Sequence, residues 1–452
     1  MFTRKKEVCM KLEGKSLKGD FLKFIIPSII AQWVFTLYTM IDGIFVAKGV
    51  SETALTAVNI SFPFVAGLFS ISILFAVGTS TVVAILFGEK NEKRANEVFT
   101  QNIVMLIVLS LVITIVVLLG LEPFARFLGA TDAALPYVKE YIGTIAPFAV
   151  CFILSYSFEI LLKTDGYPKL ATIIVTIGAV ANCILDYVFV MRFHWGVFGA
   201  AFATGFSQAL VIVFYLKHFL GKNGQLKFTK FKLDIPLIWR KFKNGLPSGI
   251  TEFSAGIIIF FFNQAILRYI GEEALVSYTI ISYVNSIVIM SMAGVAQGAQ
   301  PLISYYFGQK NIEKCKKLLR YGIVASIVIS VVSFVTCIAG TEWIVSLFVS
   351  PELTELRAYS IKVFRIFSIS FLIAGFNVVV GGYFTAVEEP TSAIIISLGR
   401  GFVTLLVSLL VLTATVGGAG IWWAPTLSEV LCLIVMLGLF MGYKKKIKKL
   451  DE

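Results

Sequence analysis

The chain has 452 residues, of which 58% are apolar and only 15% are charged, and its mean hydropathy is +0.87. A soluble domain carries roughly 45–50% apolar and about 25% charged residues, so this surplus excludes a soluble enzyme, a disordered chain and a disulfide-rich fold. The net charge of +12 would suit nucleic acid, but the basic residues lie between apolar stretches, which excludes that partner. Six scattered cysteines and two separated histidines show no metal-ligand spacing.

Twelve apolar stretches follow one another along the chain, and each is long enough to cross a bilayer. The predicted spans are 22–47, 54–86, 98–121, 136–162, 168–191, 196–219, 246–269, 275–306, 319–341, 358–385, 391–414 and 420–442. The sequence therefore predicts an all-α integral membrane protein with twelve transmembrane helices.

Most of the 39 Lys and Arg residues fall in every second connection between the spans. Because positively charged loops stay in the cytoplasm, this alternation predicts that both termini are cytoplasmic. No short apolar region with a cleavage site follows the basic start, so the first stretch is predicted to be a membrane span and not a removable signal.

The two halves of the sequence match each other at a nearly constant spacing of 220 positions. Pro27-Ser28 matches Pro247-Ser248, and Phe87-Gly88-Glu89-Lys90-Asn91 matches Phe307-Gly308-Gln309-Lys310-Asn311. Six spans in each half give both repeats one orientation, which is a transporter architecture. The predicted segments are a cytoplasmic N-terminal tail (1–20), an N-lobe (21–219), a basic cytoplasmic linker (220–245), a C-lobe (246–442) and a basic cytoplasmic tail (443–452).

Four polar side chains of the N-lobe fall at one depth in three spans. Asp42 and Asp186 each lie about 9 Å below a basic residue at the outer end, at 1.5 Å per residue. Asn182 shares a helix face with Asp186, and Thr204 lies at a similar depth in the next span. Two carboxylates in a low-dielectric site do not both stay ionised unless a cation lies between them, and otherwise one takes a proton. These oxygen donors predict a coupling site for H⁺ or Na⁺, and the alternative is a purely structural hydrogen-bond network.

Other polar residues inside the spans are candidates for a hinge or for substrate contact. Pro27 lies one turn inside the first span, where a proline favours a kink, so it is a hinge candidate. Glu252 in the seventh span is matched by Gln32 in the first, and it is a candidate for attracting a cationic substrate or titrating. The alternative for Glu252 is a polar residue in the headgroup region.

The remaining charged residues of the spans are predicted to have mainly structural roles. Glu159 and Lys163 are four residues apart, so we expect a local ion pair. Arg400 is expected to bind a carboxylate or carbonyl groups of the C-lobe, and Glu429, which the repeat matches with Gln208, is a weaker functional candidate.

Aromatic and methionine side chains are abundant and suit a cavity for flat apolar cations, because they offer cation–π and soft sulfur contacts. The wall candidates are Phe35, Tyr38, Met40, Phe158, Met290 and Met292. Ordinary helix packing is the alternative for each of them.

No catalytic set is present, since the sequence has no GxSxG, HExxH or Walker A motif. The sequence therefore predicts a transporter that needs no cofactor, is driven by an ion gradient and is not an enzyme. The alternatives are a lipid or lipid-linked precursor flippase, an intramembrane enzyme, which would need a nucleophile or metal set, and a channel.

Taken together, the motifs resemble those of the multidrug and toxin extrusion (MATE) family, closest to its MepA-like bacterial branch, over roughly residues 20–440. The motifs that carry the resemblance are Ile26-Pro27, Asp42-Gly43-Ile44-Phe45-Val46, Gly88-Glu89-Lys90-Asn91, Asn182-Cys183-Ile184-Leu185-Asp186, Gly199-Ala200-Ala201-Phe202-Ala203-Thr204, Gln300-Pro301 and Gly308-Gln309.

The resemblance implies a monomeric drug/cation antiporter of the bacterial inner membrane, with twelve helices in two bundles. It implies that the N-lobe cation site uses Asp42, Asn182, Asp186 and Thr204, and that the substrates are small amphipathic or cationic compounds. In another branch a Glu of the seventh span and an Asp of the tenth contribute. Glu252 lies near the first position, but the tenth span offers Asn377 and no Asp, which favours coupling in the N-lobe.

Overall fold

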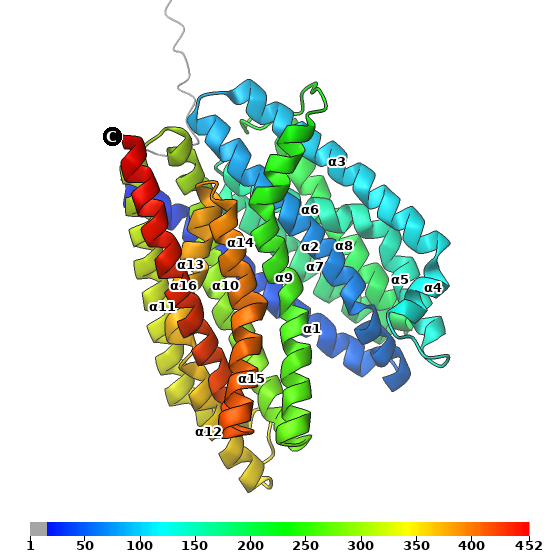
Figure 1. The fold of residues 1–452 in the computed structure, drawn as a ribbon. Coiled ribbons are helices and arrows are strands. Elements are labelled where there is room, and N and C mark those ends of the chain that lie inside the picture. The colour runs from blue at the N-terminus through cyan, green and yellow to red at the C-terminus, as the bar shows by residue number, and fades with distance from the viewer. Residues whose placement is uncertain (1–15, 452) are drawn as a thin grey trace, which may run out of the picture.

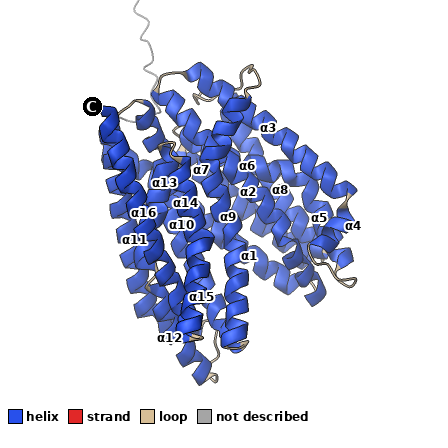
Figure 2. Ribbon diagram, in the orientation of Figure 1, coloured by secondary structure: helices blue, strands red, loops and turns tan. Residues whose placement is uncertain are grey.

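The computed structural model describes residues 16–451, and the chain is helical over most of this range (Figures 1 and 2). Residues 1–15 of the predicted N-terminal tail lie outside the described residues. The first half contains α1 (Leu17–Gly49), α2 (Glu52–Gly88), α3 (Glu92–Leu119), α4 (Leu121–Phe127), α5 (Leu135–Ile145), η1 (Ala146–Phe148), α6 (Ala149–Thr164), α7 (Pro168–Asp186), η2 (Tyr187–Arg192) and α8 (Gly196–Leu220). The second half contains α9 (Ile235–Tyr269), α10 (Glu273–Gly308), α11 (Ile312–Ser346), α12 (Thr354–Ser368), α13 (Phe371–Ala386), α14 (Pro390–Leu398), η3 (Gly399–Val403), α15 (Thr404–Val416) and α16 (Ala419–Asp451).

Twelve of the described helical segments are long and apolar enough to cross a membrane, which confirms the predicted number of spans. Most boundaries agree within a few residues, but α9 begins at Ile235 and not at 246. The helix therefore includes the last part of the predicted linker, and Lys241 is fully buried within it. At the other end, α16 continues through most of the predicted basic tail.

The repeat seen in the sequence is also present in the structure, as the same turn in both halves of the chain. Lys90 and Lys310 both adopt a left-handed backbone, with φ of 60° and 58°. The next residue in each case, Asn91 or Asn311, caps the following helix by accepting a backbone N–H three residues on, at 3.2 Å and 3.0 Å. Asparagine is a preferred residue at this cap position. Equivalent positions of the two halves thus form the same helix-to-helix turn.

The helices form two bundles, one from each half of the chain, which are close together at the end that holds the C-terminus and diverge toward the other end (Figure 1). Helix α1 packs on α10, and α2 packs on α9, across the boundary between the bundles. A Cβ atom on Gly78 would overlap the carbonyl oxygen of Lys241, and one on Gly245 would overlap that of Leu74. Glycine is required here because the backbones of α2 and α9 touch.

Large apolar side chains cover the outer surface of both bundles. On α3 the exposed set includes Val108, Val112, Ile115 and Leu119, which recur at helical spacing. The equivalent helix α11 exposes Val328, Val332 and Val335 in the same manner. Such continuous apolar faces mark contact with lipid.

Candidate functional site

The carboxyl groups of Asp42 and Asp186 meet in the N-lobe. Asp42 lies in the last third of α1, Asp186 is the last residue of α7, and these two helices pack against each other. Each of the two carboxyl groups lies close enough to affect the other electrostatically. No described residue donates a hydrogen bond to Oδ1 of Asp42 or to either carboxyl oxygen of Asp186. A hydrogen bond between them therefore requires a proton on one carboxyl group.

The other two predicted members of this site lie on α7 and α8. Asn182 is one turn before Asp186 and is 1% exposed, and neither atom of its amide has a partner among the described residues. Thr204 donates its hydroxyl to the carbonyl of Ala200 at 2.9 Å. The hydroxyl proton of Thr204 is therefore used by the backbone of α8, and only its oxygen remains available, as an acceptor. Unpartnered buried polar atoms are rare in native structures, so the carboxyl and amide groups are poised for an added ligand.

Two buried tyrosines belong to the same lobe. Tyr38 lies one helical turn before Asp42 on α1, and Tyr141 lies on α5. Tyr38 was predicted as a wall residue. Tyr141 was not predicted, because a tyrosine within an apolar span does not by itself indicate a functional site. The π-helix η2 follows Asp186 directly, and such widened turns are frequent at functional sites.

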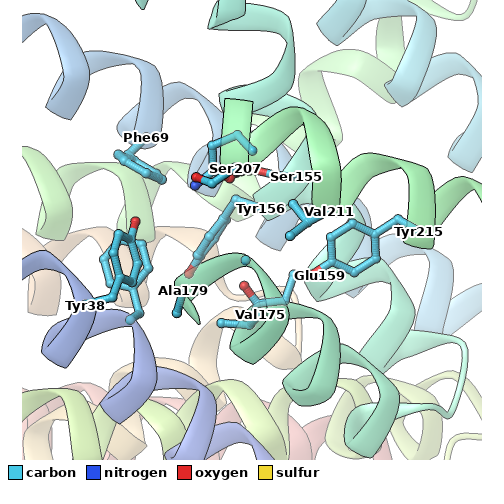
Figure 3. A pocket seen from close by; sticks show the side chains of 13 residues that line it. Tyr38, Phe69, Ser155, Tyr156, Glu159, Val175, Ala179, Ser207, Val211 and Tyr215 are labelled. Carbon is cyan, nitrogen blue, oxygen red and sulfur yellow. Dashed lines mark hydrogen bonds between the residues drawn. The ribbon is translucent and has the colours of Figure 1, made fainter. Parts of the chain in front are cut away.

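A small pocket of about 40 Å³ lies inside the N-lobe (Figure 3). Tyr38 and Glu159 both line it, together with Phe35, Phe69 and Tyr156. The volume exceeds the roughly 10–15 Å³ that one water molecule needs, and Glu159 gives it a polar wall. The pocket therefore connects Tyr38, one helical turn before Asp42, with the carboxyl group of Glu159.

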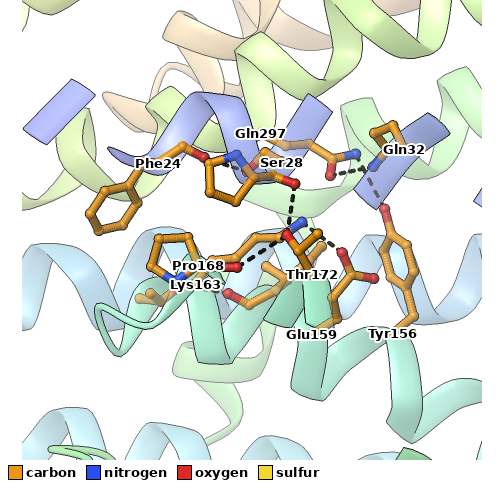
Figure 4. Close-up of polar contacts among 12 residues, drawn as sticks. Phe24, Ser28, Gln32, Tyr156, Glu159, Lys163, Pro168, Thr172 and Gln297 are labelled. Atoms are coloured by element: carbon orange, nitrogen blue, oxygen red, sulfur yellow. Dashed lines mark hydrogen bonds and ion pairs between the residues drawn. The ribbon is translucent and has the colours of Figure 1, made fainter. Parts of the chain in front are cut away.

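The predicted ion pair between Glu159 and Lys163 is present on α6. The amine donates to Oε1 of Glu159 at 2.6 Å, and the side chains are 8% and 2% exposed (Figure 4). Close by, Gln32 donates to Gln297 at 2.8 Å, and Gln297 donates to the hydroxyl of Tyr156 at 3.2 Å. This second chain of hydrogen bonds connects the two lobes.

Replacing Lys163 by methionine is expected to destabilise the protein by about 3–5 kcal/mol, because it leaves the buried carboxylate of Glu159 without its partner. The matched control is Lys139→Met, since Lys139 pairs with Glu122 at 3.1 Å where both side chains are well exposed. That exposed pair contributes about 1 kcal/mol at most. Thermal unfolding of detergent-purified protein measures both effects. Equal unfolding temperatures of the two variants would contradict the prediction, and Glu159→Gln added to Lys163→Met is expected to recover part of the loss.

A larger cavity of about 200 Å³ lies between the two lobes. Four of the predicted contact residues, Gln32, Phe35, Glu252 and Met290, line it. Phe35 also lines the N-lobe pocket, together with Phe69 and Tyr156. These three aromatic residues separate the central cavity from the small N-lobe pocket.

The structure corrects three of the wall assignments. Phe158 is 1% exposed and packs on Tyr215 and Phe219 in the N-lobe core, and Met292 is fully buried in the C-lobe core. Met40 is partly exposed and does not line the central cavity. An apolar helix reveals little about which face meets a cavity, because core and lipid both accept apolar side chains.

Pro27, the hinge candidate, is buried within α1, and the helix continues through it without a break. Its carbonyl accepts a hydrogen bond from the hydroxyl of Thr172 on α7 at 2.7 Å. The proline is thus tied to the helix that carries Asn182 and Asp186.

Comparisons with known proteins agree with this architecture. The family model described as MatE matches residues 27–188 and 247–412, one match in each half. The chain is 26% identical over 445 residues to "Multidrug export protein MepA" of Staphylococcus haemolyticus, covering 97% of this chain and 96% of the relative. It is 25% identical over 423 residues to the protein of the same description from Staphylococcus aureus, covering 92% of each.

Solved structures share the fold over nearly the whole chain. An outward-facing conformation of a multidrug resistance MATE family transporter of the MOP superfamily matches with a TM-score of 0.90 and 23% identity, covering 96% of this chain and 97% of that one. A MOP superfamily transporter from Pyrococcus furiosus matches with a TM-score of 0.90 and 22% identity, covering 100% of both chains. That transporter is described as having a binding pocket of reversed polarity, which suggests a different function for it.

Proposed function

The chain belongs to the MatE family, and from this membership and the carboxyl pair of its N-lobe we propose that it is a multidrug efflux antiporter. Family membership makes it a multi-pass membrane transporter and not an enzyme. In the proposal, the protein acts as a monomer that exports amphipathic, often cationic compounds across a bacterial cell membrane. Inward movement of H⁺ or Na⁺ drives the export.

The single observation that supports this proposal best is the meeting of Asp42 and Asp186 without a hydrogen-bond donor among the described residues. Charged groups within the membrane are costly, and they are retained where they serve transport. A proton shared by the two carboxyl groups, or a Na⁺ held by their oxygens with those of Asn182 and Thr204, would balance the charge. The same pair therefore serves either coupling ion.

The proposed cycle couples this charge change to the position of the lobes. In the outward-facing state Asp42 and Asp186 take up the ion, and α1, α7 and α8 repack. A bend at Pro27 would carry the change along α1 to its contact with α10. The lobes then rock, the cavity opens to the other side, and a new substrate molecule enters as the ion leaves.

The central cavity suits the proposed substrates. Phe35, Phe69 and Met290 offer aromatic and sulfur surfaces, and Glu252 offers a carboxylate. The curated relatives named above are described as multidrug export proteins, which supports the same substrate class for this chain.

A lipid or lipid-linked precursor flippase is the second candidate. It is kept because the similar Pyrococcus furiosus transporter is described as having a reversed pocket polarity and a different function. A flippase for anionic headgroups would need an excess of cationic side chains in the cavity. Here Arg400 is paired with Glu429, and Glu252 adds a further carboxylate, so the lining favours cationic cargo.

The test is uptake of ethidium into proteoliposomes that contain the purified protein, driven in turn by an imposed pH gradient and an imposed Na⁺ gradient. We expect uptake under one of the gradients, and that gradient names the coupling ion. Empty liposomes and the Asp42→Asn variant are the controls. No uptake under either gradient by folded protein would contradict the antiport proposal, and scrambling of a fluorescent lipid would then support the flippase.

A further inference from the structure

One wall of the central cavity carries a guanidinium group. Arg400 lies in the π-helical turn η3 and lines the cavity, and its side chain is 17% exposed. Its Nε donates to Oε1 of Glu429 on α16 at 2.9 Å. Within the described part of the chain, Nε is the only nitrogen of this guanidinium with a hydrogen-bond partner. The two terminal nitrogens are left to meet a ligand.

The partner of Arg400 is itself held in place. Asn377 on α13 donates through Nδ2 to Oε2 of Glu429 at 2.7 Å and to the backbone carbonyl of Glu429 at 2.9 Å. Both carboxylate oxygens of Glu429 are therefore occupied, one by each neighbour. The contact with Glu429 fixes the plane of the guanidinium and leaves its two terminal nitrogens available.

A carboxylate on another element lines the same cavity. Glu252 on α9 is partly exposed and forms no ion pair with Arg400. The two elements touch nearby, since a Cβ on Gly401 of η3 would lie 3.0 Å from Ser254 of α9. The cavity therefore presents the N–H donors of a guanidinium and a carboxylate that are not paired with each other.

We propose that the terminal nitrogens of Arg400 form a carboxylate-binding subsite, so that the cavity accepts zwitterionic compounds whose carboxylate lies on Arg400 and whose ammonium lies on Glu252. The inference rests on the proposed export function and specifies its substrates. Arginine binds a carboxylate through two parallel N–H···O bonds, and this geometry needs the free end of the fork. A zwitterion also adds no net charge to a cavity of low dielectric, where an added net charge is costly.

The probes are Nα-dansyl-lysine, which carries a carboxylate and an ammonium, and dansylcadaverine, which has the same fluorophore and ammonium but lacks the carboxylate. Fluorescence titration of the full-length protein gives the ratio of their two affinities. We expect Arg400→Gln to lower the affinity for dansyl-lysine relative to dansylcadaverine by about tenfold, which corresponds to 1.4 kcal/mol. Glu429→Gln is expected not to lower this ratio, because the glutamine oxygen can still accept the hydrogen bond from Nε and the guanidinium loses a competing carboxylate.

The possible outcomes distinguish the proposed carboxylate subsite from the proposed export function. Binding of dansylcadaverine with an unchanged ratio in Arg400→Gln would overturn the subsite and leave the export proposal standing. An equal loss of the ratio in Arg400→Gln and Glu429→Gln would assign Arg400 a structural role and also overturn it. Binding of neither probe by the wild-type protein would overturn both proposals. If Arg400→Gln does not fold, Arg400→Lys, which keeps the charge but not the fork, is expected to lower the ratio by a smaller factor.

Discussion

Replacing Asp42 or Asp186 by asparagine is expected to reduce gradient-driven export by more than about tenfold, because a carrier whose two states no longer differ in ion affinity cannot be driven by that ion. Each substitution keeps the shape of the side chain and removes one of the two carboxyl groups that meet in the N-lobe. The amide cannot exchange a proton near neutral pH, and it cannot balance the charge of Na⁺. Ethidium uptake into proteoliposomes, under the gradient that drives the wild-type protein, measures the loss.

The control for this pair is Asp132→Asn. Its side chain is 91% exposed and pairs with Arg126 in the connection between α4 and α5, so the same chemical change there leaves transport near the wild-type rate. The affinity for ethidium in the absence of a gradient is expected to change little in Asp42→Asn, because neither carboxyl group lines the central cavity. Full-rate export by Asp42→Asn or Asp186→Asn, at wild-type levels of folded protein, would show that the coupling group lies elsewhere.

Much of the architecture could be predicted because the membrane imposes simple rules. Apolar length gave the twelve spans, and the repeated Gly-x-Lys-Asn turn gave the division into two matched halves. The sequence also predicts one depth for Asp42 and Asp186. Both residues lie the same number of helical positions from an outer boundary, and depth in a membrane is set by the rise of the helix.

Side-chain direction could not be predicted in the same way. Phe158 and Met292 point into the lobe cores, whereas Phe35 and Met290 line the cavity, and no local pattern distinguishes the two pairs. Lipid does not select polar residues for the outer face of a helix, so the amphipathic signal of soluble proteins is lost. The position of Lys241 was misread for a related reason, since a basic residue near a span end normally stays in water.

The contact between α2 and α9 was likewise not visible in the sequence, where Gly78 and Gly245 are two glycines among 36. Only the fold brings each of them against a carbonyl oxygen of the opposite helix. The two contacts hold the lobes together toward the end that holds the C-terminus (Figure 1). Residues next to them on the same helices, Val77 on α2 and Pro247 on α9, line the central cavity. In the proposed cycle, the lobes separate at these contacts when the cavity opens toward this end.

Gly245→Ala is expected to shift the protein away from the form that is closed at this end, because its Cβ would overlap the carbonyl oxygen of Leu74. Overpacking at a close contact costs about 1–3 kcal/mol. An energy of this size changes the ratio of closed to open molecules by about 5- to 150-fold. Because the proposed cycle closes this end in every turnover, the same substitution is expected to slow export.

The shift can be measured by double electron–electron resonance between spin labels at Lys93→Cys and Glu313→Cys, which are exposed in the first turns of α3 and α11, in a background without the other cysteines. Gly245→Ala is expected to add long distances to the wild-type distribution. Two further glycines of α9 serve as graded controls. A Cβ on Gly249 would lie 3.2 Å from the Cβ of Leu74, and a Cβ on Gly256 would meet no atom within 4 Å. We expect a smaller shift for Gly249→Ala and none for Gly256→Ala. If all three variants match the wild-type distribution, the packing of α2 on α9 does not control the closure of this end, and the two lobes must be held together by the contact of α1 with α10 instead.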